Sequence, residues 1–147
     1  MKLTANEGGW ENPKLGMHQA VCVDDIDLGE VETKFGKKPR IRLMFLLDQK
    51  RSDGEPMVIG RTYGATLSPK GDLRRDLKSW RGGDLSPDEL KDFDTKILVG
   101  VQAQLNITEF QKSDGTPGTQ IETILPPVEG QKIDGSGYTP KDSDPEW

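Results

Sequence analysis

The sequence has almost none of the residues that build disulfides and metal centres. Its 147 residues include one cysteine, Cys22, and one histidine, His18. A lone cysteine forms no internal disulfide and no cysteine-rich zinc site, which favours a reducing compartment, so we expect a cytoplasmic protein. His18 and Cys22 would point to one face of a strand, but two ligands fall short of the four usual in a structural zinc site. We therefore expect neither a metal nor a cofactor.

Long apolar stretches are also missing. Only 32% of the residues are hydrophobic, and no run approaches the roughly 20 residues of a membrane-spanning helix. Residues 1–7 lack the apolar segment of a signal peptide, so we expect neither a membrane anchor nor export. The acidic cluster of Asp24, Asp25 and Asp27 has no base or nucleophile paired with it, which leaves a magnesium-dependent nuclease as a weak alternative. We expect a protein that is not an enzyme.

The net charge of -5 conceals a segregation of charge along the chain. Residues 1–33 carry two basic and seven acidic side chains, residues 34–81 carry thirteen basic and five acidic ones, and residues 82–147 carry five basic and thirteen acidic ones. A basic centre between acidic segments is typical of a site for a polyanion. A solvated surface without a ligand gives the same pattern, so charge alone leaves the two readings open.

The basic centre contains a predicted β-hairpin. Residues 39–47 and 57–67 have the composition of strands, and the Asp-Gly dipeptide between them is a turn signal. In the first strand every second residue is apolar, and the opposite face begins with Arg40 and Arg42. That face could meet a polyanion. The register of the second strand stays open, because Gly60 or Gly64 can mark a bulge.

The other elements follow from periodicity and capping signals. Residues 18–28 predict a strand that precedes the hairpin. Leu73, Leu77 and Trp80 form one stripe of a helix that ends at Gly82. Ser86-Pro-Asp-Glu is a capping box that predicts a second short helix, running to about residue 93. Two further strands and their joining loop are predicted over residues 96–110, 119–125 and 112–118.

These elements predict one all-β domain with a helical insertion, over residues 18–127. Residues 1–17 lack a period and are expected to form an N-terminal arm. Residues 128–147 are expected to form a flexible acidic tail. The order strand, strand, strand, helix, strand, strand is that of the five-stranded OB-fold barrel, in which strands two and three and the loops joining strands one to two and four to five bind oligonucleotides or oligosaccharides.

The whole chain, especially Tyr63 through Trp80-Arg81-Gly82 together with the acidic and aromatic tail, resembles the single-stranded-DNA-binding proteins encoded by bacteriophages. The resemblance implies sequence-independent binding of single-stranded DNA in phage replication or recombination, in the host cytoplasm. It also implies that the tail tip recruits replication or recombination proteins and competes with DNA for the basic groove. The corresponding tail positions are Asp142, Asp144, Glu146 and Trp147.

Binding of a single strand without sequence readout requires cations along the phosphates and flat side chains for the bases. The loops and strands of the basic centre supply both. Phe35 and Tyr63 are the stacking candidates, and Phe110 is a weaker one. The oligomeric state stays open between monomer and homodimer, and a phage structural or protein-interaction module that reuses the barrel is the alternative function. The predicted DNA-binding residues are Phe35, Lys37, Lys38, Arg40, Arg42, Arg61, Tyr63 and Lys112.

Overall fold

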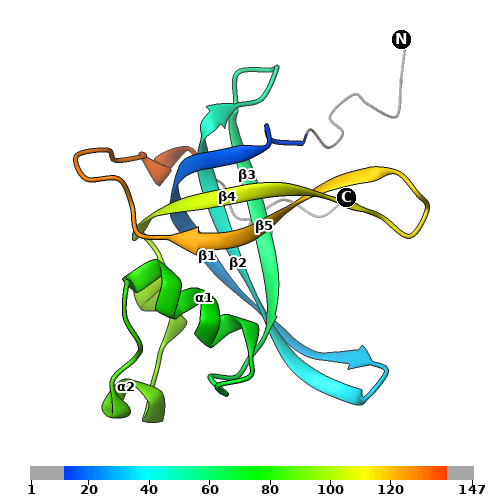
Figure 1. The fold of residues 1–147 in the computed structure, drawn as a ribbon, viewed down its shortest axis with the longest axis vertical. Helices are drawn as coiled ribbons and strands as arrows, with labels where there is room; N and C mark the ends of the chain where they lie inside the picture. Colours follow the sequence, from blue (N-terminus) through cyan, green and yellow to red (C-terminus); the bar gives the residue numbers. More distant parts are fainter. Residues whose placement is uncertain (1–11, 139–147) are drawn as a thin grey trace.

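The computed structural model of the chain describes residues 12–138, which form one antiparallel five-stranded sheet with a helical connection (Figure 1). The predicted β-rich class with a helical insertion is therefore confirmed. Between β3 and β4 lie α1 (Asp72–Arg81), α2 (Pro87–Lys91) and the 3-10 turn η1 (Thr95–Leu98), and the turn η2 (Gly135–Gly137) follows β5. The strands are β1 (Gly16–Thr33), β2 (Gly36–Lys50), β3 (Pro56–Gly64), β4 (Gln102–Gln111) and β5 (Pro117–Leu125).

The sheet is organised around β1, in the strand order β3-β2-β1-β4-β5. The first residues of β1 pair with β4, and its longer remainder pairs with β2. Two register shifts, at Cys22/Asp24 and Asp27/Gly29, interrupt the β1–β2 ladder, and such bulges bend a strand. Within residues 12–138 no backbone ladder joins the outer strands β3 and β5, so the closed barrel that we predicted is not confirmed.

The core lies between the inner face of this sheet and α1. Leu73, Leu77 and Trp80 are buried there, which confirms the predicted helical stripe. The Trp80 ring lies 5.5 Å from that of Phe45 on β2, and its indole nitrogen donates to the Gln102 carbonyl at 2.8 Å. Burying side chains of this size contributes about 1.5–3 kcal/mol each. These contacts fix α1 against β2 and against the start of β4.

The helix boundaries follow their sequence signals closely. Gly82 adopts a left-handed conformation (φ 81°), and its N–H donates to the Lys78 carbonyl, which ends α1. The capping box forms as predicted, since Ser86 accepts from the Glu89 N–H while the Glu89 carboxylate accepts from the Ser86 N–H. The second helix ends at Lys91, two residues earlier than expected.

Three predicted boundaries are wrong. Residues 95–98 form a 3-10 turn instead of a strand, and the chain turns at Gly100 (φ 94°) before β4 begins at Gln102. Residues 29–38, which separate the strand predicted over residues 18–28 from the predicted hairpin, are largely strand and not a loop, because the β1–β2 ladder continues to the pair Thr33 and Gly36. The third strand ends at Gly64 and not at residue 67. The sheet therefore carries a long β1–β2 hairpin that extends past its neighbours (Figure 1).

The two ends of the domain also differ from expectation. Strand β1 begins at Gly16, inside the predicted arm. Residues 128–138, predicted as part of a flexible tail, make specific contacts with the sheet and are called the strap below. The tail residues Asp142, Asp144, Glu146 and Trp147 lie outside the described residues. Among residues 12–138, no helix is long and apolar enough to cross a membrane.

Candidate nucleic-acid interface

The register between β2 and β3 divides the predicted site between two faces of the sheet. Residues opposite each other on antiparallel strands share a face. Leu43 is opposite Arg61 on the inner face, which packs on α1. Arg42 is opposite Thr62, one residue along each strand and therefore on the outer face. Arg61 thus lies on the opposite face of the sheet from Arg42.

Three of the predicted cations form a row on the outer face of β2. Lys38, Arg40 and Arg42 alternate along the strand, so neighbouring members lie about 6.7 Å apart along it. The guanidinium of Arg42 donates to the Thr62 hydroxyl at 2.9 Å, which holds it toward β3. We call these three residues the basic row. It begins on the projecting hairpin and continues onto the sheet, so it offers a linear series of positive charges.

Gly60 gives the outer face its shape beside this row. A Cβ at position 60 would lie 2.5 Å from the Met44 sulfur and 2.7 Å from the Arg42 Nε, so both side chains occupy the space above the glycine. The ladder is regular from Arg40/Gly64 to Leu46/Val58. The register that the sequence left open therefore contains no bulge at Gly60 or Gly64, and Gly60 serves as a shallow seat for Arg42.

Tyr63 is a corrected prediction, because its ring is not available for stacking. The side chain points to the inner face and is 1% exposed, and its hydroxyl donates to an Asp76 carboxylate oxygen at 2.6 Å. Burial, with the Asp76 charge beside it, holds the pKa of Tyr63 far above its usual range. The phenol therefore acts as a neutral hydrogen-bond donor inside the core.

Arg61 is corrected for the same reason. Its guanidinium pairs with Asp76 at 3.4 Å and Asp72 at 3.5 Å, both on α1, and donates to the Ile121 carbonyl of β5 at 2.6 Å. Since Asp76 is 2% exposed, Arg61 compensates a buried carboxylate. The residue connects β3, α1 and β5, and these partners replace the phosphates that we expected it to bind.

The tip of the β1–β2 hairpin carries the remaining candidate residues of this region. Phe35 is 77% exposed, with the Lys34 ammonium 5.3 Å from its ring centre. Lys37 is opposite Glu32, on the face away from Lys38, and is therefore not part of the basic row. Phe35 thus has a free ring face for a base, and its stacking role stays a prediction.

Lys112 lies in the other long hairpin. Its backbone N–H donates to the Thr116 carbonyl in the β4–β5 turn, and Phe110 beside it is 40% exposed. Figure 1 shows the tips of the β1–β2 and β4–β5 hairpins well apart. The structure therefore does not bring Lys112 next to the basic row.

The strap covers part of the outer face, which sequence reasoning missed. Val21 and Leu46 are opposite each other on that face and are each 3% exposed, although neither belongs to the core under α1. Gly135 of the strap lies against Val21 and Val23, since a Cβ there would be 3.2 Å from the first and 2.9 Å from the second. At the end of the strap, the Tyr138 hydroxyl donates to Asp24 at 3.0 Å. The irregular, glycine-containing sequence of the strap carried no signal of this docking.

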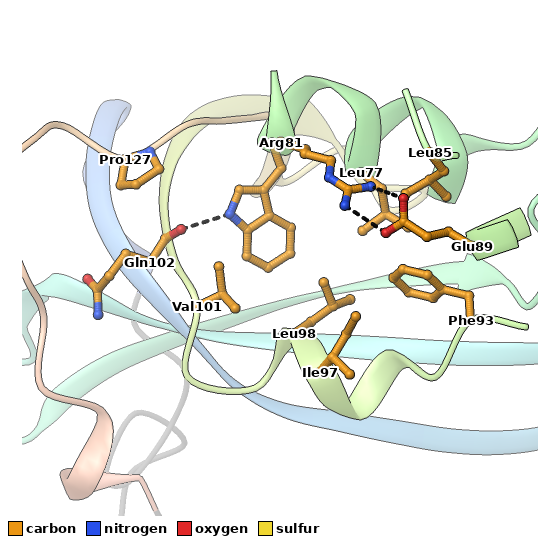
Figure 2. A pocket seen from close by; sticks show the side chains of 11 residues that line it. Leu77, Arg81, Leu85, Glu89, Phe93, Ile97, Leu98, Val101, Gln102 and Pro127 are labelled. Atoms are coloured by element: carbon orange, nitrogen blue, oxygen red, sulfur yellow. Dashed lines mark hydrogen bonds and ion pairs between the residues drawn. The ribbon is translucent and has the colours of Figure 1, made fainter. Parts of the chain in front are cut away.

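A separate apolar pocket of about 280 Å³ lies at the helical end of the sheet (Figure 2). Trp80, Ile97 and Leu98 are among the residues that line it. Arg81 and Glu89 form a two-bond ion pair at its edge, at 2.7 and 2.6 Å. The hydrogen bonds from Arg81 hold the pKa of Glu89 at about 2, so this carboxylate stays ionised and is unsuited to proton transfer. The pocket suits an apolar group better than a reaction.

His18 and Cys22 do not form a metal site. Both ring nitrogens of His18 have acceptors, the Asp48 carboxylate at 2.8 Å and the Lys14 carbonyl at 2.7 Å. Cys22 is fully buried, and this burial raises the pKa of its thiol to about 12. No group of three or more metal-ligating side chains gathers within the part of the chain that the structure describes.

Comparison with known proteins gives no family. No family model and no curated protein matches the sequence.

Proposed function

We propose that the chain is a sequence-independent single-stranded-DNA-binding protein whose interface is the outer face of β2. The observation that carries the proposal is the basic row, in which Lys38, Arg40 and Arg42 share one face at regular spacing. A row of charges tracks a sugar-phosphate backbone without reading base edges. Phe35 at the hairpin tip supplies a ring for stacking at one end of this row.

We also propose that the sheet is a partly open OB-type barrel, a fold that commonly binds oligonucleotides on this region. Three features support it. Strand β1 pairs with both β2 and β4. The helix α1, which lies between β3 and β4 in the sequence, packs on the inner face of the sheet. The Arg61 side chain links β3 to the carbonyl of Ile121 on β5. Arg61 thus connects the two outer strands, β3 and β5, which no backbone ladder joins within residues 12–138.

Binding by such a row depends on salt. Each phosphate contact on a single strand lowers the log of affinity by roughly 0.7 per log unit of salt. The three cations of the basic row therefore predict a slope of log affinity against log salt of about -2. In this proposal the protein acts in phage replication or recombination, and the acidic segment with Asp142, Asp144, Glu146 and Trp147 recruits partner proteins. The same segment competes with DNA for the row, because its charge is opposite.

The decisive experiment is fluorescence anisotropy of a labelled thymidine oligonucleotide at two salt concentrations, with duplex DNA and RNA as competitors. The double variant Arg40→Glu/Arg42→Glu should weaken binding by at least about tenfold at low salt, because it replaces attraction with repulsion along the row.

The matched control is Lys70→Glu/Lys78→Glu, which changes the net charge equally at two exposed positions away from the outer face. It should retain most of the affinity. Absence of binding by the unaltered protein at low salt would refute the proposal, and an equal loss in both variants would show that net charge, and not the row, determines binding.

A protein-interaction module is the second candidate function. The observation in its favour is the pocket beside Trp80, next to which Ile97 and Val101 expose 62% and 41% of their surface. Exposed apolar groups around a cavity are typical of interaction sites. Comparing the ultraviolet absorbance of the purified protein at the nucleic-acid and protein maxima separates the two candidates, since co-purified nucleic acid is expected only for the first.

A further inference from the structure

A second cavity, of about 640 Å³, lies at the base of the β1–β2 hairpin and is called the groove below. Its lining comes from three places: the hairpin itself, the segment that follows β3, and the segment between α2 and η1. A cavity of this size is typical of sites that hold a small ligand or one part of a larger one.

The groove adjoins the basic row at Arg40. This residue belongs both to the row and to the lining of the groove, and its partner on β3 is Gly64, the last residue of that strand. The pairing of β2 with β3 ends there, and the next residues, Ala65 and Thr66, line the groove. A DNA strand that follows the row therefore meets the groove at Arg40.

Part of the lining is apolar. Ile41 of β2 and Leu73 of α1 line the groove as members of the buried core. Leu67, Leu90 and Phe93 are partly buried and pack against that core. Apolar walls suit the flat faces of a nucleobase, and the polar edge of the base then requires hydrogen-bond partners.

The carboxylates of Asp25, Asp27 and Asp94 supply acceptors in the same groove. Asp25 accepts from the Thr95 hydroxyl, and Asp27 accepts from the Gly29 N–H, each at 2.8 Å. A carboxylate has about four acceptor positions, so one such bond holds the group in place and leaves acceptors for a ligand. Both Asp25 and Asp27 lie on the inner face of the hairpin, opposite Leu43 and Ile41.

Charge distinguishes the two parts of a nucleotide at this place. Arg40 and Lys96, which also line the groove, attract phosphates, whereas the three carboxylates repel them. A nucleotide therefore binds with its phosphate at Arg40 and its base toward Asp25 and Asp27. Guanine offers such carboxylates two adjacent N–H donors, and cytosine and adenine offer one amino group. Thymine offers an N–H between two carbonyl oxygens, which carboxylates repel.

We propose that the groove receives one base of the bound DNA strand and prefers bases that carry an exocyclic amino group, guanine above all. Asp25 and Asp27 accept from the base, and Arg40 holds the adjoining phosphate. The inference rests on the proposed function, to which it adds a preference at one nucleotide, while the basic row itself distinguishes no bases.

The test compares three labelled oligonucleotides by fluorescence anisotropy with the full-length protein. They are a thymidine run and the same run with its central base replaced by cytosine or by guanine. The guanine oligonucleotide should bind at least about fivefold more tightly than the thymidine run, because a good bidentate contact to a base discriminates by at least about 1 kcal/mol. The cytosine oligonucleotide should lie between the two.

Two variants locate the preference in the groove. Asp27→Asn keeps an oxygen for the Gly29 N–H but removes the charge, so the preference for guanine should be lost while the thymidine run binds equally well or more tightly. Ala65→Trp fills the groove from an exposed position and should also abolish the preference. The salt slope for the thymidine run should not change in Ala65→Trp, because no phosphate contact is removed.

Asp114→Asn is the matched control. Asp114 is exposed in the β4–β5 turn and accepts from the backbone N–H two residues later, as Asp27 does, so the same charge and the same kind of contact are altered. This variant should keep the preference for guanine. An equal loss of preference in Asp27→Asn and Asp114→Asn, or a preference that survives Ala65→Trp, would overturn the inference.

The unaltered protein separates the inference from the proposed function. Equal affinity for the three oligonucleotides, or tighter binding of the thymidine run, would overturn the inference and leave the proposed function standing. Absence of binding to all three at low salt would overturn both.

Discussion

Arg42 and Arg61 lie on adjacent strands but on opposite faces of the sheet, and their surroundings differ completely. Arg42 faces outward and donates to the Thr62 hydroxyl, whereas Arg61 faces inward to Asp72, Asp76 and a carbonyl of β5. The charge of the first is available to a ligand, and the charge of the second is neutralised inside the fold. Strand register therefore determines which cations of a basic segment stay on the surface and which are paired inside the fold.

The largest effect is expected from Arg61→Ala. This change removes one of the two cations that pair with the buried Asp76, and Arg75 stays 3.3 Å from its other oxygen, so the expected loss is a part of the about 3–5 kcal/mol that breaking a buried pair costs. Urea denaturation should show this loss of unfolding free energy, while DNA binding at native conditions stays near normal. A stable Arg61→Ala variant with impaired DNA binding would reverse the roles assigned to the two arginines.

Tyr63→Phe should have a smaller effect on the same inner face. It leaves Asp76 with one partner fewer, which is expected to cost about 1–3 kcal/mol. The pKa of Tyr63 is raised in the folded state, so the phenol ionises first in the unfolded state. The stability that it contributes is therefore lost as the pH rises above the ordinary tyrosine pKa of 10.0.

The unfolding free energy of the unaltered protein should therefore fall more steeply above that pH than that of Tyr63→Phe. Denaturation curves at several alkaline pH values measure the difference. Parallel curves for the two proteins would mean that the phenol is not held neutral by its surroundings.

The smallest effect is expected from Gly60→Ala on the outer face. The new Cβ would displace the flexible ends of Arg42 and Met44, so stability should change by less than about 1 kcal/mol while DNA affinity falls about two- to threefold. Gly64→Ala is the control, because its nearest neighbour would be 3.9 Å away. Equal DNA binding by both variants would show that the position of Arg42 above Gly60 does not affect affinity.

Local signals predicted the parts of the fold that local physics determines. The stripe of Leu73, Leu77 and Trp80, the cap at Ser86 and the alternation along β2 each depend on residues a few positions apart, and each is present in the structure. The strand predicted over residues 96–99 is wrong because a few consecutive apolar residues fit a short turn as well as a strand, and in this turn only Leu98 is buried.

The candidate site was harder to predict, because it depends on which face each strand presents. Met57 and Ile59 are buried and have the same parity as Arg61 and Tyr63, so the sequence did contain a signal that these two point inward. The strap had no comparable signal, since its docking depends on Gln102, some thirty residues away in the chain.

The central position of β1 also sets the order in which the molecule can be assembled during synthesis. The ladder of β1, β2 and β3 joins neighbouring segments, whereas His18 finds its partner Leu105 only 87 positions later. Local pairings close early and distant ones close late, because long loops cost more entropy to close. A nascent chain therefore makes the basic row before α1 and β4 cover its reverse side, and the strap reaches its place only after β5 has emerged.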